Sequence, residues 1–157
     1  MENTLTTDIA ATAQELALQL TATSKTGAKL SKVESLHIRL AEAVEGYDKV
    51  LANWAAKFAS DPCYAMEWGM GALEAAASRS VLTQLMEASF KRMTDADEKR
   101  THEELFDLFQ DWVSTEAMRR ATQFKQSSSP MSNMVEQYQT VMWAKIARNF
   151  DTNMPWF

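Results

Sequence analysis

The sequence has little of what interrupts helices or cross-links chains. Its 157 residues include four glycines, three prolines and a single cysteine. Scarce Gly and Pro, with abundant Ala, Leu, Met, Glu, Gln and Lys, favour helix throughout, and no run of β-branched residues alternates as a strand would. The single cysteine, Cys63, excludes an internal disulfide, which fits a reducing compartment.

Targeting signals and positive charge are also scarce. No Lys or Arg precedes Lys25, so the N-terminus lacks the basic region and the apolar run of a secretory signal. No stretch approaches the roughly 20 apolar residues of a membrane span. The net charge of −5 opposes a general attraction to nucleic acid. We therefore expect a cytoplasmic protein, bacterial or from a phage, that does not associate with membranes.

The apolar content is sufficient for one hydrophobic core. Apolar residues make up 46% of the chain and include five Trp, seven Phe and ten Met. A chain of this length suits one domain, and neither an internal repeat nor a linker divides it. We expect residues 1–157 to form a single all-α domain, with a non-helical aromatic tail over residues 151–157.

Helical periodicity predicts a bundle of about five helices. Capping boxes, in which a Ser or Thr and a Glu exchange side chain-to-backbone hydrogen bonds, mark helix starts at Ser31 and Thr101. Asp61 and Pro62 mark another start, because Asp caps a helix and Pro suits its first turn. Two glycines indicate a kink or a delayed helix start near Met70. The predicted helices cover about 6–20, 31–59, 62 or 70 to 93, 101–124 and 130–150.

The longest predicted helix carries a regular apolar seam with steps of 4 and 3 residues. Such a seam keeps one direction along a helix and favours a long partner helix. We therefore expect helices two and three to form a long antiparallel hairpin around residues 60–62. The seam grows bulkier toward Pro62, where we expect either the densest core packing or the footprint of a partner. Its members are Val33, His37, Leu40, Val44, Tyr47, Leu51, Trp54 and Phe58.

Glu34 and His37 have the Glu-x-x-His spacing that di-iron carboxylate bundles use twice. This chain has only one such pair, and the capping box already gives Glu34 an ordinary role. We therefore predict a neutral histidine at position 37, near the open end of the seam and hydrogen-bonded within the core or at its edge, and neither a metal nor another cofactor. A metal-dependent bundle enzyme is retained as an alternative hypothesis, with ligands from Glu34, His37, His102 and either Glu103 or Glu104.

Other catalytic signatures are missing from the sequence. Cys63 is predicted in the first turn of a helix, where the helix dipole favours a thiolate, but no base accompanies it in the sequence. We expect Cys63 to be buried and inert. No Gly-x-Ser-x-Gly elbow or phosphate-binding glycine loop occurs, so we predict that the protein is not an enzyme.

The leading hypothesis is a helical protein that binds another protein or assembles with copies of itself. The seam and the aromatic tail exceed what a minimal bundle needs, because a terminal Trp-Phe pair must dock on its own bundle or on another subunit. Large aromatic residues are frequent interface anchors. The predicted partner contacts are Trp54, Phe58, Trp143, Trp156 and Phe157.

A different class of function is a helical subunit of a nucleoprotein complex. Short basic clusters stand beside aromatic residues that are able to stack on bases, although acidic residues flank every cluster. Nucleic acid would then be bound only within a complex. The predicted phosphate contacts are Lys91, Arg92, Arg119, Arg120 and Lys125.

Overall fold

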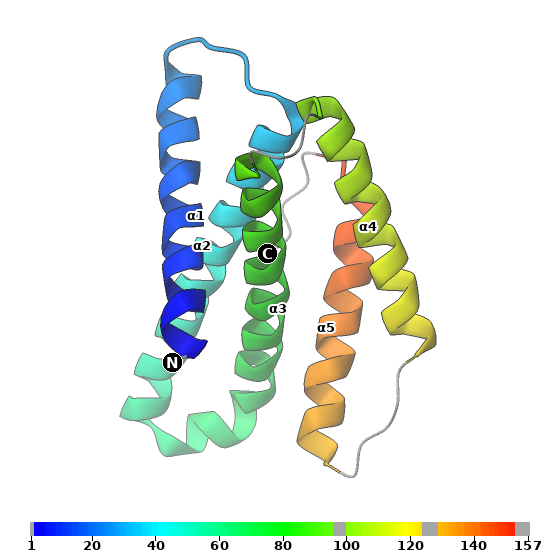
Figure 1. Cartoon of the computed structure of the whole chain (residues 1–157). Helices are drawn as coiled ribbons and strands as arrows, with labels where there is room; N and C mark the ends of the chain where they lie inside the picture. Colours follow the sequence, from blue (N-terminus) through cyan, green and yellow to red (C-terminus); the bar gives the residue numbers. More distant parts are fainter. Residues whose placement is uncertain (1, 96–99, 124–128, 153–157) are drawn as a thin grey trace.

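The computed structural model describes residues 2–95, 100–123 and 129–152, with the side chains of α1 described from Ile9 onward. Over these residues the protein is all-α, and the predicted bundle of about five helices is confirmed (Figure 1). Among the described residues, no helix has both the length and the apolar character needed to cross a bilayer. The helices are α1 (Glu2–Lys25), α2 (Lys32–Ser60), α3 (Pro62–Thr94), α4 (His102–Thr122) and α5 (Pro130–Arg148).

Both predicted capping boxes are present. The Ser31 hydroxyl accepts from the Glu34 amide at 3.2 Å, and the Glu34 carboxylate accepts from the Ser31 amide at 2.8 Å. Thr101 and Glu104 form the same pair of bonds at 3.2 and 2.8 Å. Each box satisfies two backbone donors that helix geometry leaves without partners, so it fixes where α2 and α4 begin.

The predicted bounds of two helices need correction. α1 begins at Glu2, earlier than the predicted start near residue 6, and it ends at Lys25, shortly before Gly27, whose positive φ of 85° suits the end of a helix. The delayed start near Met70 is also wrong, because α3 begins at Pro62 and runs through both glycines. The cap at Asp61 starts the helix despite the weak helix propensity of glycine.

The predicted hairpin forms the centre of the fold. α2 and α3 pack along one another as an antiparallel pair, and α1 lies against one side of that pair. α4 and α5 pack together on the other side, with α5 against α3 (Figure 1). The end of the hairpin, where α2 turns into α3, therefore lies at the opposite end of the molecule from the start of α4.

One cluster of buried side chains draws on all five helices. Its largest members include Trp143, Phe109 and Phe150, and the Phe150 ring lies 5.6 Å from that of Phe109. The buried residues of α2 end at Val44, and those of α3 begin at Ala75. The densest packing is therefore in the half of the hairpin away from the turn, and the prediction of a densest core at the aromatic end of the seam is wrong.

The described chain ends against α2. Phe150 follows α5 and is buried, and its carbonyl accepts a bond from Arg39 at 3.2 Å. Asp151 pairs with Lys32 at 3.7 Å. Asp151 and Thr152 lie in a turn and a bend after α5, whereas the rest of the predicted non-helical tail, including Trp156 and Phe157, lies outside the described residues.

Candidate functional site

The end of the α2–α3 hairpin carries apolar side chains that the fold does not bury. We define the hairpin tip as residues 45–74, a stretch in which no residue is buried. On either side of it the core resumes at once, with Val44 and Ala75 buried. The second half of the apolar seam lies within the tip and is only half-buried, through Tyr47, Leu51, Trp54 and Phe58. The seam is therefore longer than the part that the bundle covers.

Four aromatic rings form a connected cluster in the hairpin tip. Trp54 lies at its centre, with ring centroids 5.6 Å from Phe58, 5.8 Å from Tyr64 and 6.4 Å from Trp68. Tyr64 in turn lies 6.2 Å from Phe58 and 6.0 Å from Trp68. Tilted rings at these separations attract one another beyond the area that they bury. The cluster therefore holds the end of α2 against the start of α3.

The turn itself is held by short-range hydrogen bonds. The Asp61 carboxylate accepts from the Cys63 amide at 3.0 Å, and the Ser60 hydroxyl donates to the Lys57 carbonyl at 2.9 Å. The Lys57 ammonium lies 5.3 Å from the Tyr64 ring centroid and donates to the Tyr64 hydroxyl at 3.3 Å. These bonds fix the backbone of the turn, so the backbone loses little conformational entropy on binding.

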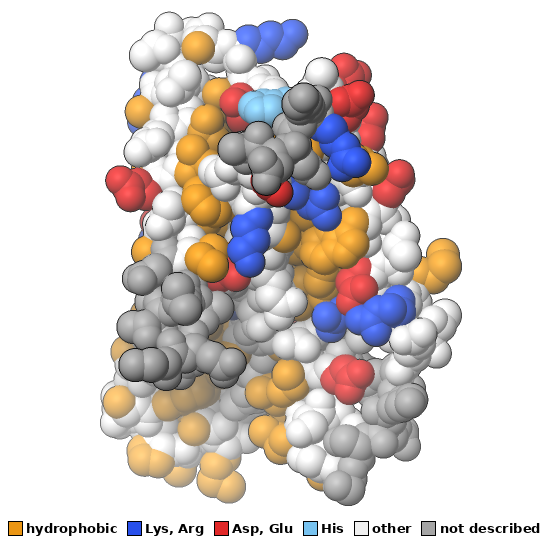
Figure 2. Space-filling model, viewed as in Figure 1, with side chains coloured by type: hydrophobic (Ala, Val, Ile, Leu, Met, Phe, Trp, Pro, Cys, Tyr) orange, Lys and Arg blue, Asp and Glu red, His pale blue; other side chains and the backbone are white. Residues whose placement is uncertain are grey.

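α3 exposes three large apolar side chains in the hairpin tip, one of which, Trp68, belongs to the ring cluster. Met66 is 89% exposed, Trp68 50% and Met70 42%. Figure 2 shows hydrophobic side chains gathered at the end of the molecule where α2 turns into α3. Single exposed apolar residues are ordinary on protein surfaces, but a contiguous group that includes aromatic rings is typical of an interaction surface.

The structure separates the predicted partner contacts into three groups. Trp54 and Phe58 lie in the hairpin tip, as part of the ring cluster. Trp143 is 1% exposed and contacts Trp112 edge-on in the core, so it does not belong to a surface. Trp156 and Phe157 lie outside the described residues.

Sequence reasoning missed the α3 half of the tip. Tyr64 and Trp68 are four residues apart within the first two turns of the helix that begins at Pro62, so they share a helix face beside the turn. In the predicted hairpin, this spacing would have indicated that Tyr64 and Trp68 lie opposite Trp54. Cys63 was also placed wrongly, since its thiol is exposed rather than buried. A position in the first turn of a helix does not determine which side faces solvent.

His37 is a core residue that connects three helices. It is fully buried on α2, its Nε2 lies 2.8 Å from the Ala13 carbonyl of α1, and its Nδ1 lies 2.6 Å from the Ser89 hydroxyl of α3. A carbonyl only accepts, so Nε2 carries a proton and donates it to the Ala13 carbonyl. The Ser89 oxygen also lies 2.8 Å from the Met86 carbonyl, so its single proton is donated either to that carbonyl or to Nδ1 of His37. Burial lowers the pKa of His37 below 6.5, although the Ala13 carbonyl acts in the opposite direction.

The residues of the predicted metal alternative do not converge on one point. His102 Nδ1 lies 2.9 Å from the Ser31 hydroxyl and 3.6 Å from the Glu34 carboxylate, so it joins the start of α4 to the start of α2. Both nitrogens of His37 are instead bonded to Ala13 and Ser89. Within the described part of the chain, no three His, Cys, Asp or Glu side chains group as metal ligands.

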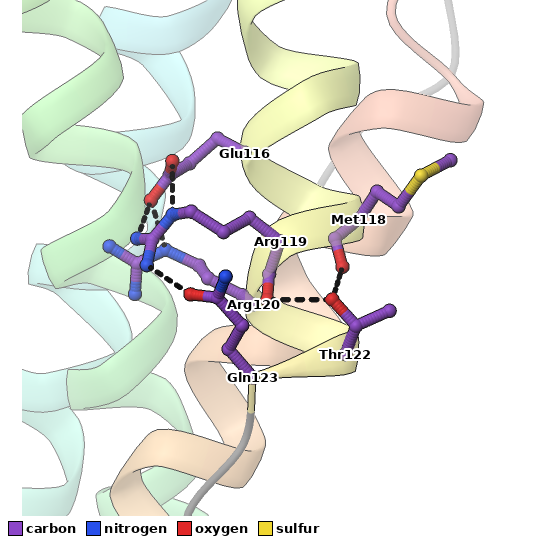
Figure 3. Close-up of polar contacts among 6 residues, drawn as sticks. All are labelled: Glu116, Met118, Arg119, Arg120, Thr122 and Gln123. Carbon is purple, nitrogen blue, oxygen red and sulfur yellow. Dashed lines mark hydrogen bonds and ion pairs between the residues drawn. The ribbon is translucent and has the colours of Figure 1, made fainter.

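The predicted phosphate contacts on α4 are engaged with an acid of the same helix. Glu116 accepts from Arg119 at 2.9 Å and from Arg120 at 3.0 Å (Figure 3). Both arginines lower the pKa of Glu116, with the hydrogen bond from Arg119 contributing most. Arg120 also lies 5.0 Å from the Trp143 ring. These contacts compete with binding to phosphate.

The contacts predicted near the end of α3 differ from one another. The Arg92 guanidinium lies over the rings of Phe109 and Trp112 at 5.4 and 5.6 Å, and it thereby joins α3 to α4. Lys91 is exposed. Lys125 lies outside the described residues. Arg92 and Arg120 each lie over one ring of the Trp112–Trp143 pair, whose ring centroids are 5.7 Å apart.

Comparison of the chain with protein-family models, with curated protein sequences and with solved structures finds no significant match.

Proposed function

We propose that this protein is a non-enzymatic helical interaction protein that binds another protein through the hairpin tip. One observation carries the proposal: residues 45–74 contain no buried side chain, yet they hold a four-ring aromatic cluster and exposed Met66, Trp68 and Met70. A hairpin end that had only to connect two helices would be shorter and more polar.

The energetics of the tip favour binding over a role in the core. Covering apolar surface contributes roughly 25 cal/mol per Å² removed from water, and Trp and Tyr are the most frequent anchors of protein interfaces. The Met side chains add adaptable apolar surface. The ring contacts hold Trp54, Tyr64 and Trp68 in place before a partner arrives, which lowers the entropic cost of association for these side chains.

The exposed thiol of Cys63 supports a cytoplasmic location for this function. A lone exposed thiol would form intermolecular disulfides in an oxidising compartment, whereas a reducing one keeps it free. The same thiol lies beside the ring cluster, two residues after the Asp61 cap. It therefore offers a natural attachment point for a probe of this surface.

A photo-crosslinker on Cys63 tests the proposal. The labelled protein is irradiated in a lysate of its source cells, and crosslinked species are identified by mass spectrometry. Sedimentation velocity of the unlabelled protein reports self-association through the same surface. We expect a defined crosslinked partner with the wild type, and its loss in a tip variant carrying Met66→Ala and Trp68→Ala.

A matched variant controls for general loss of apolar surface. Leu18→Ala with Met118→Ala removes two side chains that are as exposed as those of the tip but lie on α1 and α4. We expect this variant to keep the crosslinked partner. Equal capture by the wild type and the tip variant would contradict the proposal, as would the absence of any specific capture or self-association.

A further inference from the structure

The exposed face of α3 in the hairpin tip alternates apolar and acidic side chains. Glu67, Met70 and Glu74 are spaced by three and four residues, so they lie along one face of the helix, with Met66 beside them. Glu67 and Glu74 are both exposed, and within the described part of the chain neither makes an ion pair. The face therefore combines uncovered apolar surface with uncompensated negative charge.

The charge of the whole tip has the same sign. Residues 45–74 contain five Asp or Glu and two Lys, which gives a net charge of −3, and one of these acids, Asp48, is paired with Arg79 just outside the tip. Lys49 already pairs with Glu45 at 2.9 Å, and Lys57 is held over the Trp54 and Tyr64 rings at 5.8 and 5.3 Å. Neither lysine is placed to neutralise Glu67 or Glu74.

We infer that the occupant of the hairpin tip is an amphipathic helix of a partner protein, with Lys or Arg residues flanking its apolar stripe. This inference rests on the proposed function and specifies its partner. Apolar residues at helical spacing would cover Met66 and Met70, and the flanking cations would pair with Glu67 and Glu74. Trp68 lies on the side of α3 that faces Trp54. Methionine-rich apolar surfaces with acidic borders suit such helices, because the thioether side chains adapt to different apolar partners.

Charge argues against two other occupants. A second copy of the chain brings a net charge of −5 and the same acidic tip, so association between copies sets like charges against one another. An anionic lipid surface repels the acidic tip for the same reason. A basic helix is the occupant that gains from the charge of the tip as well as from its apolar surface.

The test uses three synthetic 18-residue helical peptides with one shared leucine pattern, in which the polar positions are all Lys, all Glu or all Gln. Binding is followed by the anisotropy of a fluorophore on Cys63 of the full chain. We expect saturable binding of the Lys peptide, weakening with added salt, and much weaker binding of the Gln and Glu peptides. The tip variant, Met66→Ala with Trp68→Ala, should lose at least about tenfold in affinity for the Lys peptide.

Two charge variants separate the tip from the overall charge of the protein. Glu67→Gln with Glu74→Gln should weaken binding of the Lys peptide about two- to tenfold at low salt. Asp107→Asn with Asp111→Asn removes the same charge from exposed positions on α4 and should leave binding unchanged. Equal weakening by both pairs would show general attraction between opposite charges and would overturn the inference.

Three further outcomes would also overturn it. In the first, the Glu or Gln peptide binds as strongly as the Lys peptide, in a manner that depends on Trp68. That outcome would leave the tip as an interaction surface but remove the requirement for a basic partner. A Trp68-dependent dimer in sedimentation would make a second copy the occupant, and Trp68-dependent flotation with phosphatidylcholine vesicles would make it a lipid surface. If no peptide binds the tip, the inference fails, while crosslinking from Cys63 still decides the proposed function independently.

Discussion

The backbone of Gly71 lies against the indole of Trp54, so closely that a Cβ atom at position 71 would stand 3.2 Å from Cζ2 of Trp54. The two residues come from opposite arms of the hairpin, and the indole occupies the space that a side chain at position 71 would fill. A glycine on one helix thus accommodates the largest side chain of the other. Gly69, one half-turn earlier, has no atom within 4 Å of the corresponding position.

The two glycines should therefore respond differently to the same substitution. Gly69→Ala should raise the free energy of unfolding by about 0.5–1 kcal/mol, because Ala is the better helix former and meets no obstacle. Gly71→Ala should gain less than this or lose stability, because its methyl group pushes against Trp54. Urea unfolding measures both, and an equal gain for the two variants would contradict the close contact.

Burial of His37 predicts a loss of stability in mild acid. The pKa of His37 in the folded protein is below 6.5, so below pH 6.5 the unfolded chain binds a proton that the folded chain excludes. The stability difference between the wild type and His37→Gln should be constant above pH 7. It should then fall by up to about 1.4 kcal/mol per pH unit below 6.5, until the pKa of the folded state is reached.

Urea unfolding of both proteins between pH 5 and 8 measures this difference directly. His37→Gln keeps a polar side chain at the position but does not titrate, so the comparison removes contributions from the other acids and from His102. A difference that does not change with pH, or that grows in acid, would show that the ring is not held in its neutral form.

Glu116 predicts a second acid-dependent loss in a lower pH range. Arg119 and Arg120 lower the pKa of Glu116, so this carboxylate stabilises the fold above about pH 4.5, and its contribution disappears as the pH falls toward the pKa of the folded state. Glu116→Gln should cost less than about 1 kcal/mol at pH 7, because the pairs lie near the surface. The cost should shrink below pH 4.5 in thermal unfolding, and a cost that rises in acid would be inconsistent with these pairs.

Removing the cap hydroxyl should cost more stability at Ser31 than at Thr101, because the Ser31 hydroxyl also bonds to a residue of a second helix. Thr101→Ala should cost about 1 kcal/mol, the usual value for an N-cap. Ser31→Ala should cost about 0.5–1.5 kcal/mol more, because it also removes the hydrogen bond with His102. In a His102→Ala background, Ser31→Ala should cost no more than Thr101→Ala. If Ser31→Ala still costs the same additional free energy in that background, the link between α2 and α4 has no energetic role.

Sequence reasoning succeeded where the determining contacts are local. Ser31 and Asp61 mark the starts of α2 and α3 through bonds to amides two or three residues away, so the hairpin could be placed from the sequence alone. The burial of His37 followed from the regular seam. Its partners Ala13 and Ser89 did not, because they lie on other helices.

The extent of the core could not be predicted in this way. The apolar pattern of α2 continues unchanged from Val44 to Trp54, although the bundle covers the first and leaves the second half-exposed. Periodicity shows which face of a helix is apolar, whereas coverage depends on where α1, α4 and α5 lie. For the same reason Trp143 was predicted at a surface, and Tyr64 and Trp68 were not predicted at all.

If the aromatic residues of the hairpin tip serve binding rather than the core, two tryptophan substitutions should differ sharply in their cost to stability. Trp68→Ala and Trp143→Ala remove the same side chain, one 50% exposed in the tip and the other 1% exposed in the core. Urea unfolding should give a loss of about 3–5 kcal/mol for Trp143→Ala and of no more than about 2 kcal/mol for Trp68→Ala. Equal losses for the two variants would place Trp68 within the core and refute its assignment to a binding surface.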